Sequence, residues 1–449
     1  GTADSEGFMK LADASAESLG EVGDILRIGK TGFDFGFHLI QGLPLLGAAV
    51  FNPKLLGVWG KSVVNGFKSF AHPKQLETFI AQNVDMLDEA VPLGLEVGYK
   101  ASDMYAGASG QIAKQLSRVK GMSKLKEQTI GRFEAQFIHS GDVLRIEGYN
   151  ALRESALRTA GGDATSEAGQ KALRELVSFL NKSTGSLNSL ELGIRPTQRA
   201  LERAFVFFSP RYTRACLALI KDAMMTGGVQ GQQARRALYG MAGLGMGTYI
   251  TISSLLDQEP DLDPRSSTFM SIKVNDDTLG IGSFWRSFAS FIVRQGDHAL
   301  TPEDIMEQQR GSPLVSWLRG RGSPISGMGW DIFTGRDFLG RPLETPADIG
   351  KHLGRGMLPF WAEQAMIADP YRIGGAGTIS EVFGMRTRPR NVWERRQSLR
   401  DELSQKDYNK QWNNLNDLQR NTLKKKYEED LSVLDQTARD LANRTGTDL

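Results

Sequence analysis

The chain has 449 residues, a formal net charge of +2, and 40% hydrophobic and 24% charged residues. This length exceeds what one ordinary hydrophobic core supports, so we expect two or three structural units, and the composition is far from that of a disordered chain. Cys216 is the only cysteine and the five histidines lie far apart. An intrachain disulfide and a thiolate metal cluster are therefore excluded, and we expect no metal and no cofactor.

The N-terminal region begins with an acidic stretch rich in small residues, for which we predict a helix over 1–30. The chain starts at Gly1 without a secretory pattern, which is compatible with a piece of a longer precursor. The apolar run 33–51, "FDFGFHLIQGLPLLGAAVF", contains Pro44 and several polar residues. These breakers favour a buried helix-turn-helix over a membrane span.

Helical patterns continue from residue 52 to about 180. "NPKLLGVWGKSVVNGFKSFAHPK" predicts one amphipathic helix that stops at His72-Pro73. In "AGGDATSEAG", Asp163 or Thr165 is expected to cap the helix that carries "KALRELVSFL". The polar stretch 181–196 predicts a hinge or loop.

The segment "SPRYTRACLALIKDAMM" has the features of a helix start, with Ser209 as N-cap and Pro210 at the first helical position. Its apolar residues recur at helical spacing and predict a buried face. They are Tyr212, Ala215, Cys216, Leu219, Ile220 and Ala223. The opposite face is expected to carry Arg211, Arg214, Lys221 and Asp222.

Residues 237–256, "ALYGMAGLGMGTYITISSLL", contain no formal charge. Their length would suit a membrane span, whereas their glycines and hydroxyl residues favour a helix that packs closely on another. Gly240, Gly243 and Gly247 are the candidates for such packing. We expect the segment to be buried against protein, and its insertion into lipid stays open.

Arginines gather around this segment and could contact DNA phosphates or anionic lipid headgroups, while a solvated helix face is the competing interpretation. The candidates are Arg195, Arg199, Arg203, Arg211, Arg214, Arg235 and Arg236.

Beyond residue 256 the chain changes character. The segment "STFMSIKVNDDTLGIGSF" predicts a β-hairpin that turns at 275–277. Residues 308–390 are expected to be loop-rich and extended. The last sixty residues are predicted to be helical again. The predicted fold class is mainly α, an irregular multi-helix assembly with one small β-hairpin and long loop-rich segments. We divide it into 1–30, an acidic helix; 31–190, a helical domain; 191–310, a central helical domain; 311–390, a loop-rich region; and 391–449, charged helices.

Motifs that resemble catalytic sequences are incomplete. The Gly-Lys-Ser/Thr runs at 27–31 and 57–62 lack the first glycine of a phosphate-binding loop. Glu154 in "ALRESALRT" matches one element of lytic transglycosylases, but we expect a surface carboxylate that pairs with Arg153 or Arg158. We therefore predict no catalytic residue and no enzymatic activity.

The stretch "FFSPRYTRA", the apolar segment after it and "LDPRSSTFMSIKVNDDTLGIGSFWRSFASFIVR" resemble a module of large bacteriophage polyvalent or internal virion proteins. The stretches "FDFGFHLIQGLPLLG" and "LGRPLETP" are similar to the same module. The resemblance implies a mostly helical, non-enzymatic protein that is carried in the virion and delivered to the bacterial envelope or cytoplasm.

The expected function is that of an internal or ejection protein that forms a ring or tube with copies of itself or other virion proteins and assists genome delivery. Phage DNA and the host inner membrane are further expected partners, and a small-molecule substrate is not expected. Two alternatives remain open: an injected effector that binds host protein or DNA to protect the incoming genome, and an envelope-degrading enzyme.

Overall fold

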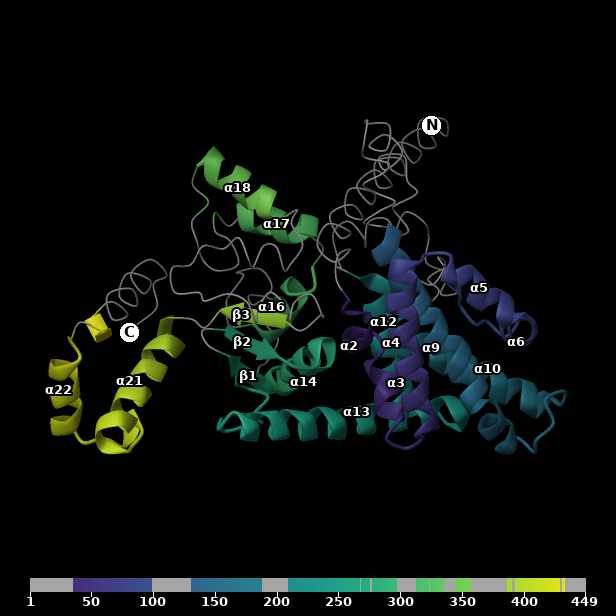
Figure 1. Cartoon of the computed structure of the whole chain (residues 1–449), viewed down its shortest axis with the longest axis horizontal. Coiled ribbons are helices and arrows are strands. Elements are labelled where there is room, and N and C mark those ends of the chain that lie inside the picture. Colours follow the sequence, from purple (N-terminus) through teal and green to yellow (C-terminus); the bar gives the residue numbers. More distant parts are fainter. Residues whose placement is uncertain are drawn as a thin grey trace, which may run out of the picture.

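The computed structural model describes residues 35–98, 131–187, 209–266, 268–274, 277–296, 312–322, 324–333, 335, 343, 345–356, 386–389, 392–428 and 430–432. These parts are mainly helical with one small antiparallel sheet, which confirms the predicted fold class. Figure 1 shows a helical bundle at one end, the sheet in the middle and the C-terminal helices at the other end. The predicted helix over 1–30 lies outside the described residues, and the domain boundaries stay predictions.

The bundle forms around α9 (Gly131–Arg158), which is buried along most of its length. The helices around it are α2 (Phe37–Ile40), α3 (Leu43–Ala48), α4 (Lys54–Ala71), α5 (Gln75–Gln82), α6 (Val84–Ala90), α10 (Glu167–Ser183), α12 (Pro210–Met225) and α13 (Gly228–Leu255). The run 33–51 thus contains two short buried helices, and α4 ends at His72 as predicted. Leu45, Leu144 and Leu176 are among the fully buried side chains of this core.

Small residues let α4 and α9 approach closely. Ser62, Gly66 and Ser69 recur on one side of α4 and are buried against α9. A Cβ atom at Gly66 would overlap the Ser140 hydroxyl of α9. The hydroxyl of Ser62 donates to the Ser140 carbonyl at 2.8 Å, so the polar atoms of this contact are satisfied inside the core.

Two helix starts test the predicted caps. The N-cap of α10 is Ser166, whose hydroxyl accepts from Gly169 N at 3.0 Å. Asp163 instead accepts from the amide and hydroxyl of Thr165 in the preceding turn. Both predicted caps were therefore wrong, because Asp163 lies three residues and Thr165 one residue before the observed N-cap. Helix α12 begins at Pro210 after Ser209, as predicted, but the Ser209 side chain makes no capping hydrogen bond.

The predicted faces of α12 hold in part, because Ile220 and Ala223 of the apolar face are only half-buried. Tyr212, Ala215, Cys216 and Leu219 are buried. Asp222, expected on the polar face, is also buried, because Lys182 of α10 pairs with it at 2.7 Å.

The sheet contains the predicted hairpin and one additional strand. β1 (Ser271–Val274) pairs antiparallel with β2 (Asp277–Gly280), with Ser271 opposite Gly280. β3 (Arg386–Pro389) pairs with the other edge of β2, with Asp277 opposite Pro389. This third strand was not predicted, because its partner lies about a hundred residues earlier and no local pattern marks it.

The region 311–390 was expected to be extended, and this needs correction where the structure describes it. It contains α16 (Pro313–Arg319), α17 (Pro324–Phe333) and α18 (Pro346–Gly356). Each begins with a proline that follows Ser or Thr. Proline interrupts a helix in its interior, but it is favoured at the first helical position. At α18 the Thr345 hydroxyl accepts from Asp348 N at 3.1 Å and closes the cap.

The remaining elements are α14 (Ser283–Gly296), α21 (Val392–Tyr408), the 3-10 helix η5 (Trp412–Asn414) and α22 (Asp417–Lys426). The aromatic rings of Tyr212 and Phe284 meet edge to face and join α12 to α14. The C-terminal helices pack around Trp412, Leu415 and Leu423. Leu423 and Leu431 are buried there.

Candidate interaction surface

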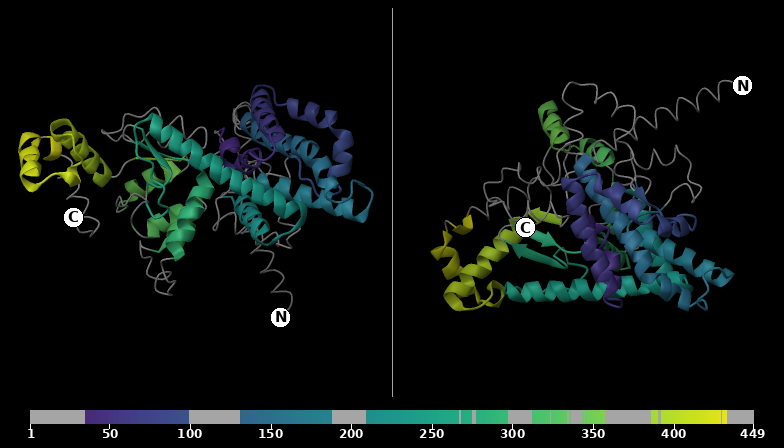
Figure 2. Two further views of the ribbon diagram at one scale, coloured as in Figure 1. Left: turned by 90° about the horizontal axis from the view of Figure 1, so that it is seen from below. Right: turned by 45° about the vertical axis from the view of Figure 1, so that its right-hand side comes forward.

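Helix α13 runs from the helical bundle to the sheet. Figures 1 and 2 show it as one long rod that passes under both parts. Its first half packs on α3, α10 and α12, and its far end contacts β1. The candidate Gly240 lies in the packed half, where a Cβ would overlap the carbonyl oxygen of Gly47 in α3. This glycine therefore serves close helix packing within the chain.

The far end of α13 is anchored by a buried tyrosine. The Tyr249 hydroxyl accepts from Asp261 N at 2.8 Å and donates to the Ser271 carbonyl at 3.4 Å. Just beyond the helix, Gln258 bonds both the amide and the carbonyl of Lys273 in β1. These bonds hold the end of α13 against the hairpin.

Between these two anchors α13 is open to solvent, which corrects the expectation that 237–256 is buried against protein. Of residues 241–256, only Tyr249 and Ser253 are buried. Gly243 and Gly247 have no heavy atom within 4 Å of an added Cβ. The exposed residues of this stretch include Leu244, Met246 and Ile250 among its glycines and hydroxyl residues.

An open groove of about 400 Å³ lies along this exposed stretch. The described residues that line it are Gly243, Leu244, Gly247, Thr248, Thr251 and Ile252. No helix in the described parts of the chain combines the length and the apolar character needed to cross a bilayer.

The structure describes four of the seven candidate arginines, and it does not gather them into one patch. Arg235 donates to the carbonyls of Ala223 and Thr226, both at 3.1 Å, and so caps the end of α12. Arg211 lies 3.8 Å from the Glu96 carboxylate. Arg214 and Arg236 are half-buried. Arg195, Arg199 and Arg203 lie outside the described residues.

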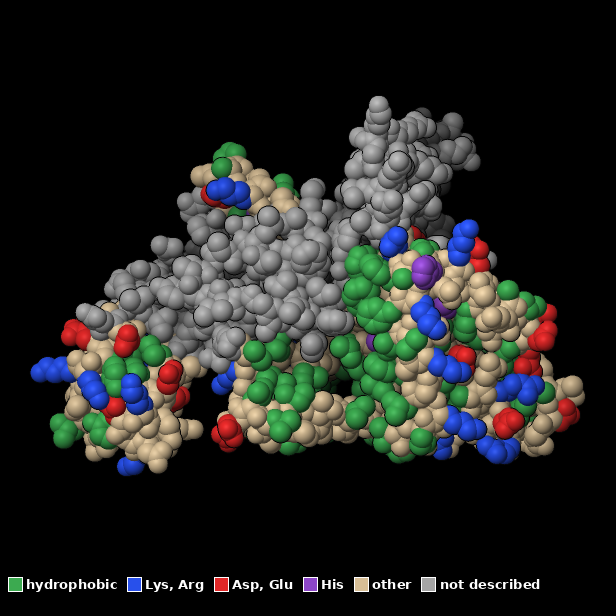
Figure 3. Space-filling model, viewed as in Figure 1, with side chains coloured by type: hydrophobic (Ala, Val, Ile, Leu, Met, Phe, Trp, Pro, Cys, Tyr) green, Lys and Arg blue, Asp and Glu red, His purple; other side chains and the backbone are tan. Residues whose placement is uncertain are grey.

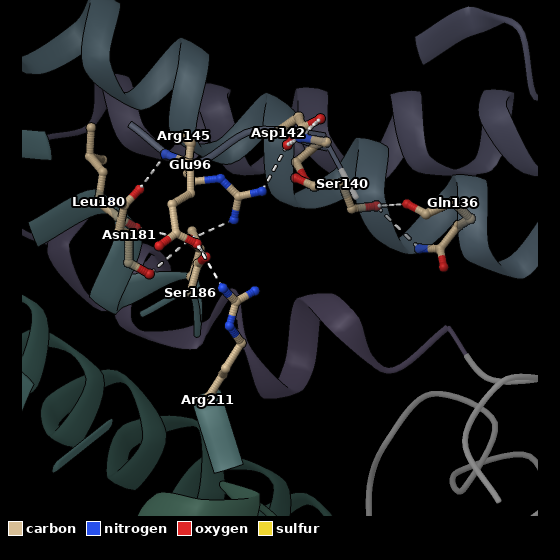
Figure 4. Close-up of polar contacts among 12 residues, drawn as sticks. Glu96, Gln136, Ser140, Asp142, Arg145, Leu180, Asn181, Ser186 and Arg211 are labelled. Carbon is tan, nitrogen blue, oxygen red and sulfur yellow. Dashed lines mark hydrogen bonds and ion pairs between the residues drawn. The ribbon is translucent and has the colours of Figure 1, made fainter. Parts of the chain in front are cut away.

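Arg211 reaches a polar network that fixes the segment after α6 against three helices (Figure 4). The Glu96 amide donates to Asn181 Oδ1 at 3.1 Å, and the Ser186 hydroxyl donates to the Glu96 carboxylate. In the same network, Arg145 donates to Asp142 at 2.8 Å and to Thr184 at 3.0 Å. The network therefore stabilises the fold, because its side chains bond one another.

Asp142 and Arg145 form the buried ion pair of this network. Their side chains are 0% and 3% exposed. Burial raises the pKa of Asp142, while the charge and hydrogen bond of Arg145 oppose this shift. Gly98 N also donates to both Asp142 oxygens at 3.0 Å, so the carboxylate is held from two sides.

Buried histidine–serine pairs also lie in the bundle. His38 Nε2 is 2.9 Å from the Ser62 hydroxyl, and His139 bonds Ser69. Both serines are 0% exposed, so a substrate cannot reach either hydroxyl in this structure. In the described parts, His, Cys, Asp and Glu side chains do not group into a metal site.

The described residues of the other sequence motifs occupy structural positions, and the run 27–31 lies outside the described residues. Residues 57–62 belong to the continuous helix α4 and form no phosphate-binding loop. Arg153 pairs with Glu89 at 2.7 Å instead of with Glu154, whose side chain is exposed. Burial raises the pKa of the Cys216 thiol to about 12, which keeps it in the unreactive thiol form.

The sequence interpretation missed an apolar surface on α4. We call it the α4 apolar face and define it by five exposed side chains: Val50, Phe51, Leu56, Val64 and Phe67. Hydrophobic side chains form a stripe along this side of the bundle in Figure 3. The amphipathic pattern of α4 was recognised, but which side faces solvent depends on the contact with α9.

The chain matches no protein-family model, no curated protein and no solved structure in the comparisons made.

Proposed function

We propose that this chain is a structural protein of a bacteriophage particle, of the internal or ejection type. It assembles with copies of itself or with other virion proteins into a ring or tube and assists genome delivery across the host envelope. The proposal assigns no catalytic residue and no cofactor.

The observation that carries the proposal is the exposed middle of α13. Residues 237–256 have no formal charge, yet most of 241–256 lies open in the single chain. Leu244, Met246 and Ile250 are each about 40% exposed, and Gly243 and Gly247 leave room for a second backbone. Small residues that recur four apart let helices approach closely, so this stretch suits a contact between subunits.

The resemblance of the sequence to delivered virion proteins supports the same interpretation, because such proteins work as assemblies. The injected-effector alternative receives less support from the arginines, since Arg211 and Arg235 are engaged within the chain.

Assembly can be tested by replacing the open glycines. We expect wild-type protein to form a defined oligomer in light scattering and cross-linking. The Gly243→Leu/Gly247→Leu variant should keep its helical content, because both positions are open, and yet form smaller species. Gly350→Leu is the matched control, since that helical glycine also has open space around it.

Location gives the second arm of the test. The protein should be found in purified particles, and cryo-electron microscopy should place it inside the capsid or tail. Wild-type protein that stays monomeric at all concentrations and is missing from particles would contradict the proposal. Steeply salt-dependent DNA binding without assembly would instead support the injected effector.

A further inference from the structure

Helix α4 has apolar side chains on the side that faces away from the bundle. Its buried side carries Leu55 and Val58 together with Ser62, Gly66 and Ser69. Its outward side carries Leu56, Val64 and Phe67, which are 57%, 53% and 43% exposed. A surface helix ordinarily shows the reverse arrangement, with polar residues outward.

The α4 apolar face includes two residues of the turn that precedes the helix. Val50 and Phe51, at the start of this turn, are 55% and 52% exposed. From Leu56 to Phe67 the face extends about 16 Å along the helix axis at 1.5 Å per residue. Exposed apolar surface of this extent, arranged in one row, is characteristic of a docking site.

The charged residues that α4 itself contributes beside this face are all lysines. Lys54, Lys61 and Lys68 recur every seven residues and therefore line one flank of α4. Residues 54–71 contain no Asp or Glu. Lys61 bonds Glu147 of α9 at 2.9 Å, whereas Lys54 and Lys68 are exposed.

We propose that the α4 apolar face docks onto a lipid bilayer that contains anionic headgroups. A helix with apolar residues outward and lysines at its flank matches the boundary between acyl chains and negative headgroups, with the lysine stems reaching up to the charge. A bilayer also adapts to a convex helix, whereas a protein partner would need a matching groove. Contact between two copies of α4 is disfavoured, because each copy would present the exposed Lys54 and Lys68 and α4 offers no carboxylate to pair with them.

This inference rests on the proposed function and deepens it, because it names the surface with which a delivered protein would meet the host membrane. The lipid contact uses α4, whereas the assembly contact uses α13. The two can therefore fail separately.

The test is flotation of the full-length chain with vesicles of phosphatidylcholine alone or with about 30% phosphatidylglycerol. We expect binding to the anionic vesicles that falls as NaCl is raised. Leu56→Gln/Val64→Gln should lower partitioning about tenfold or more by removing apolar contact. Lys54→Glu/Lys68→Glu should lower it by a similar factor on anionic vesicles only.

The control variant is Leu418→Gln/Lys424→Glu on α22, which changes an exposed leucine and an exposed lysine away from α4. It should bind vesicles like wild type. Circular dichroism confirms that each variant is folded, and the substituted side chains are exposed, so folding should persist.

Three results would overturn the proposal: no binding of wild type to anionic vesicles, equal binding by the α4 variants, or α4 variants that change oligomer size and not lipid binding. The last result would assign the face to a protein contact. Wild-type protein that forms oligomers but does not bind anionic vesicles would refute this inference alone. Absence of oligomers and absence from particles would refute the proposed function, whatever the vesicles show.

Discussion

Gly47 and Gly240 bring the backbones of α3 and α13 into contact, and neither position has room for a side chain. A Cβ at Gly240 would overlap the Gly47 carbonyl oxygen and lie 3.3 Å from the Val50 Cβ. A Cβ at Gly47 would lie 2.6 Å from Met241 N. This contact fixes where α13 leaves the bundle, and it thereby sets the position of the exposed stretch that follows.

Glycines on the same helix should therefore respond to alanine in opposite directions. Gly240→Ala should lower the free energy of unfolding by about 1–3 kcal/mol, because two backbones must separate. Gly243→Ala should raise it by about 0.5–1 kcal/mol, since alanine favours the helix and meets nothing there. Urea unfolding of both variants measures the difference, and equal effects would show that α3 and α13 do not touch at Gly240.

Local patterns in the sequence were sufficient for several elements. The Ser209-Pro210 start of α12, the end of α4 at His72 and the hairpin of β1 and β2 follow from residues within one or two turns of each feature. These features depend on caps, proline geometry and short-range strand pairing, which single sequences record directly.

The features that could not be predicted depend on partners distant in sequence. Asp222 is buried because Lys182 reaches it, and β3 forms because β2 offers a free edge. The apolar side of α4 faces outward because its other side, with the small residues Ser62, Gly66 and Ser69, packs on α9. Likewise, Gly243 and Gly247 were expected to be packed like Gly240, yet only Gly240 meets a neighbour.

Removing only Arg145 from the buried Asp142–Arg145 pair should lower the free energy of unfolding more than removing both residues. Arg145→Leu leaves a buried carboxylate without its cation, and we expect the free energy of unfolding to fall by about 3–5 kcal/mol. Asp142→Leu/Arg145→Leu should cost less, because no charge is left unpaired. Lys61→Met, which breaks the exposed pair with Glu147, is the control and should cost about 0–1 kcal/mol.

The Arg145→Leu variant should also show a steeper pH dependence than the wild type, in which Arg145 opposes the raised pKa of Asp142 but does not cancel it. Burial raises the pKa of Asp142, so without Arg145 the carboxyl binds its proton more readily in the folded state than in the unfolded state. Stability of the variant should then improve as the pH falls and worsen as it rises. A wild-type-like pH profile for the variant would contradict this assignment of the charge.

Two buried histidines should weaken the fold in mild acid. Burial lowers the pKa of His38 and of His139 from 6.5 to about 4. Between these pH values the unfolded chain binds protons that the folded chain does not, so the free energy of unfolding falls as the pH drops from 6.5 to 4. Each histidine contributes a slope of up to about 1.4 kcal/mol per pH unit.

Urea titrations between pH 4.5 and 7.5 measure this slope. His38→Gln should reduce it, since glutamine does not titrate and its amide can still bond Ser62. His72→Gln, at an exposed position, is the control and should leave the slope unchanged. A slope that is the same in wild type and His38→Gln would show that His38 is not protonated on unfolding.

Two substitutions at the start of α10 distinguish the observed N-cap, Ser166, from the predicted cap Thr165. Ser166→Ala removes the hydroxyl that accepts from Gly169 N, and we expect the free energy of unfolding to fall by about 1 kcal/mol. Thr165→Ala should have a smaller effect, because the Thr165 hydroxyl bonds only the exposed Asp163. Thermal unfolding followed by circular dichroism distinguishes the two. A larger loss in Thr165→Ala would move the cap back to the position that the sequence suggested.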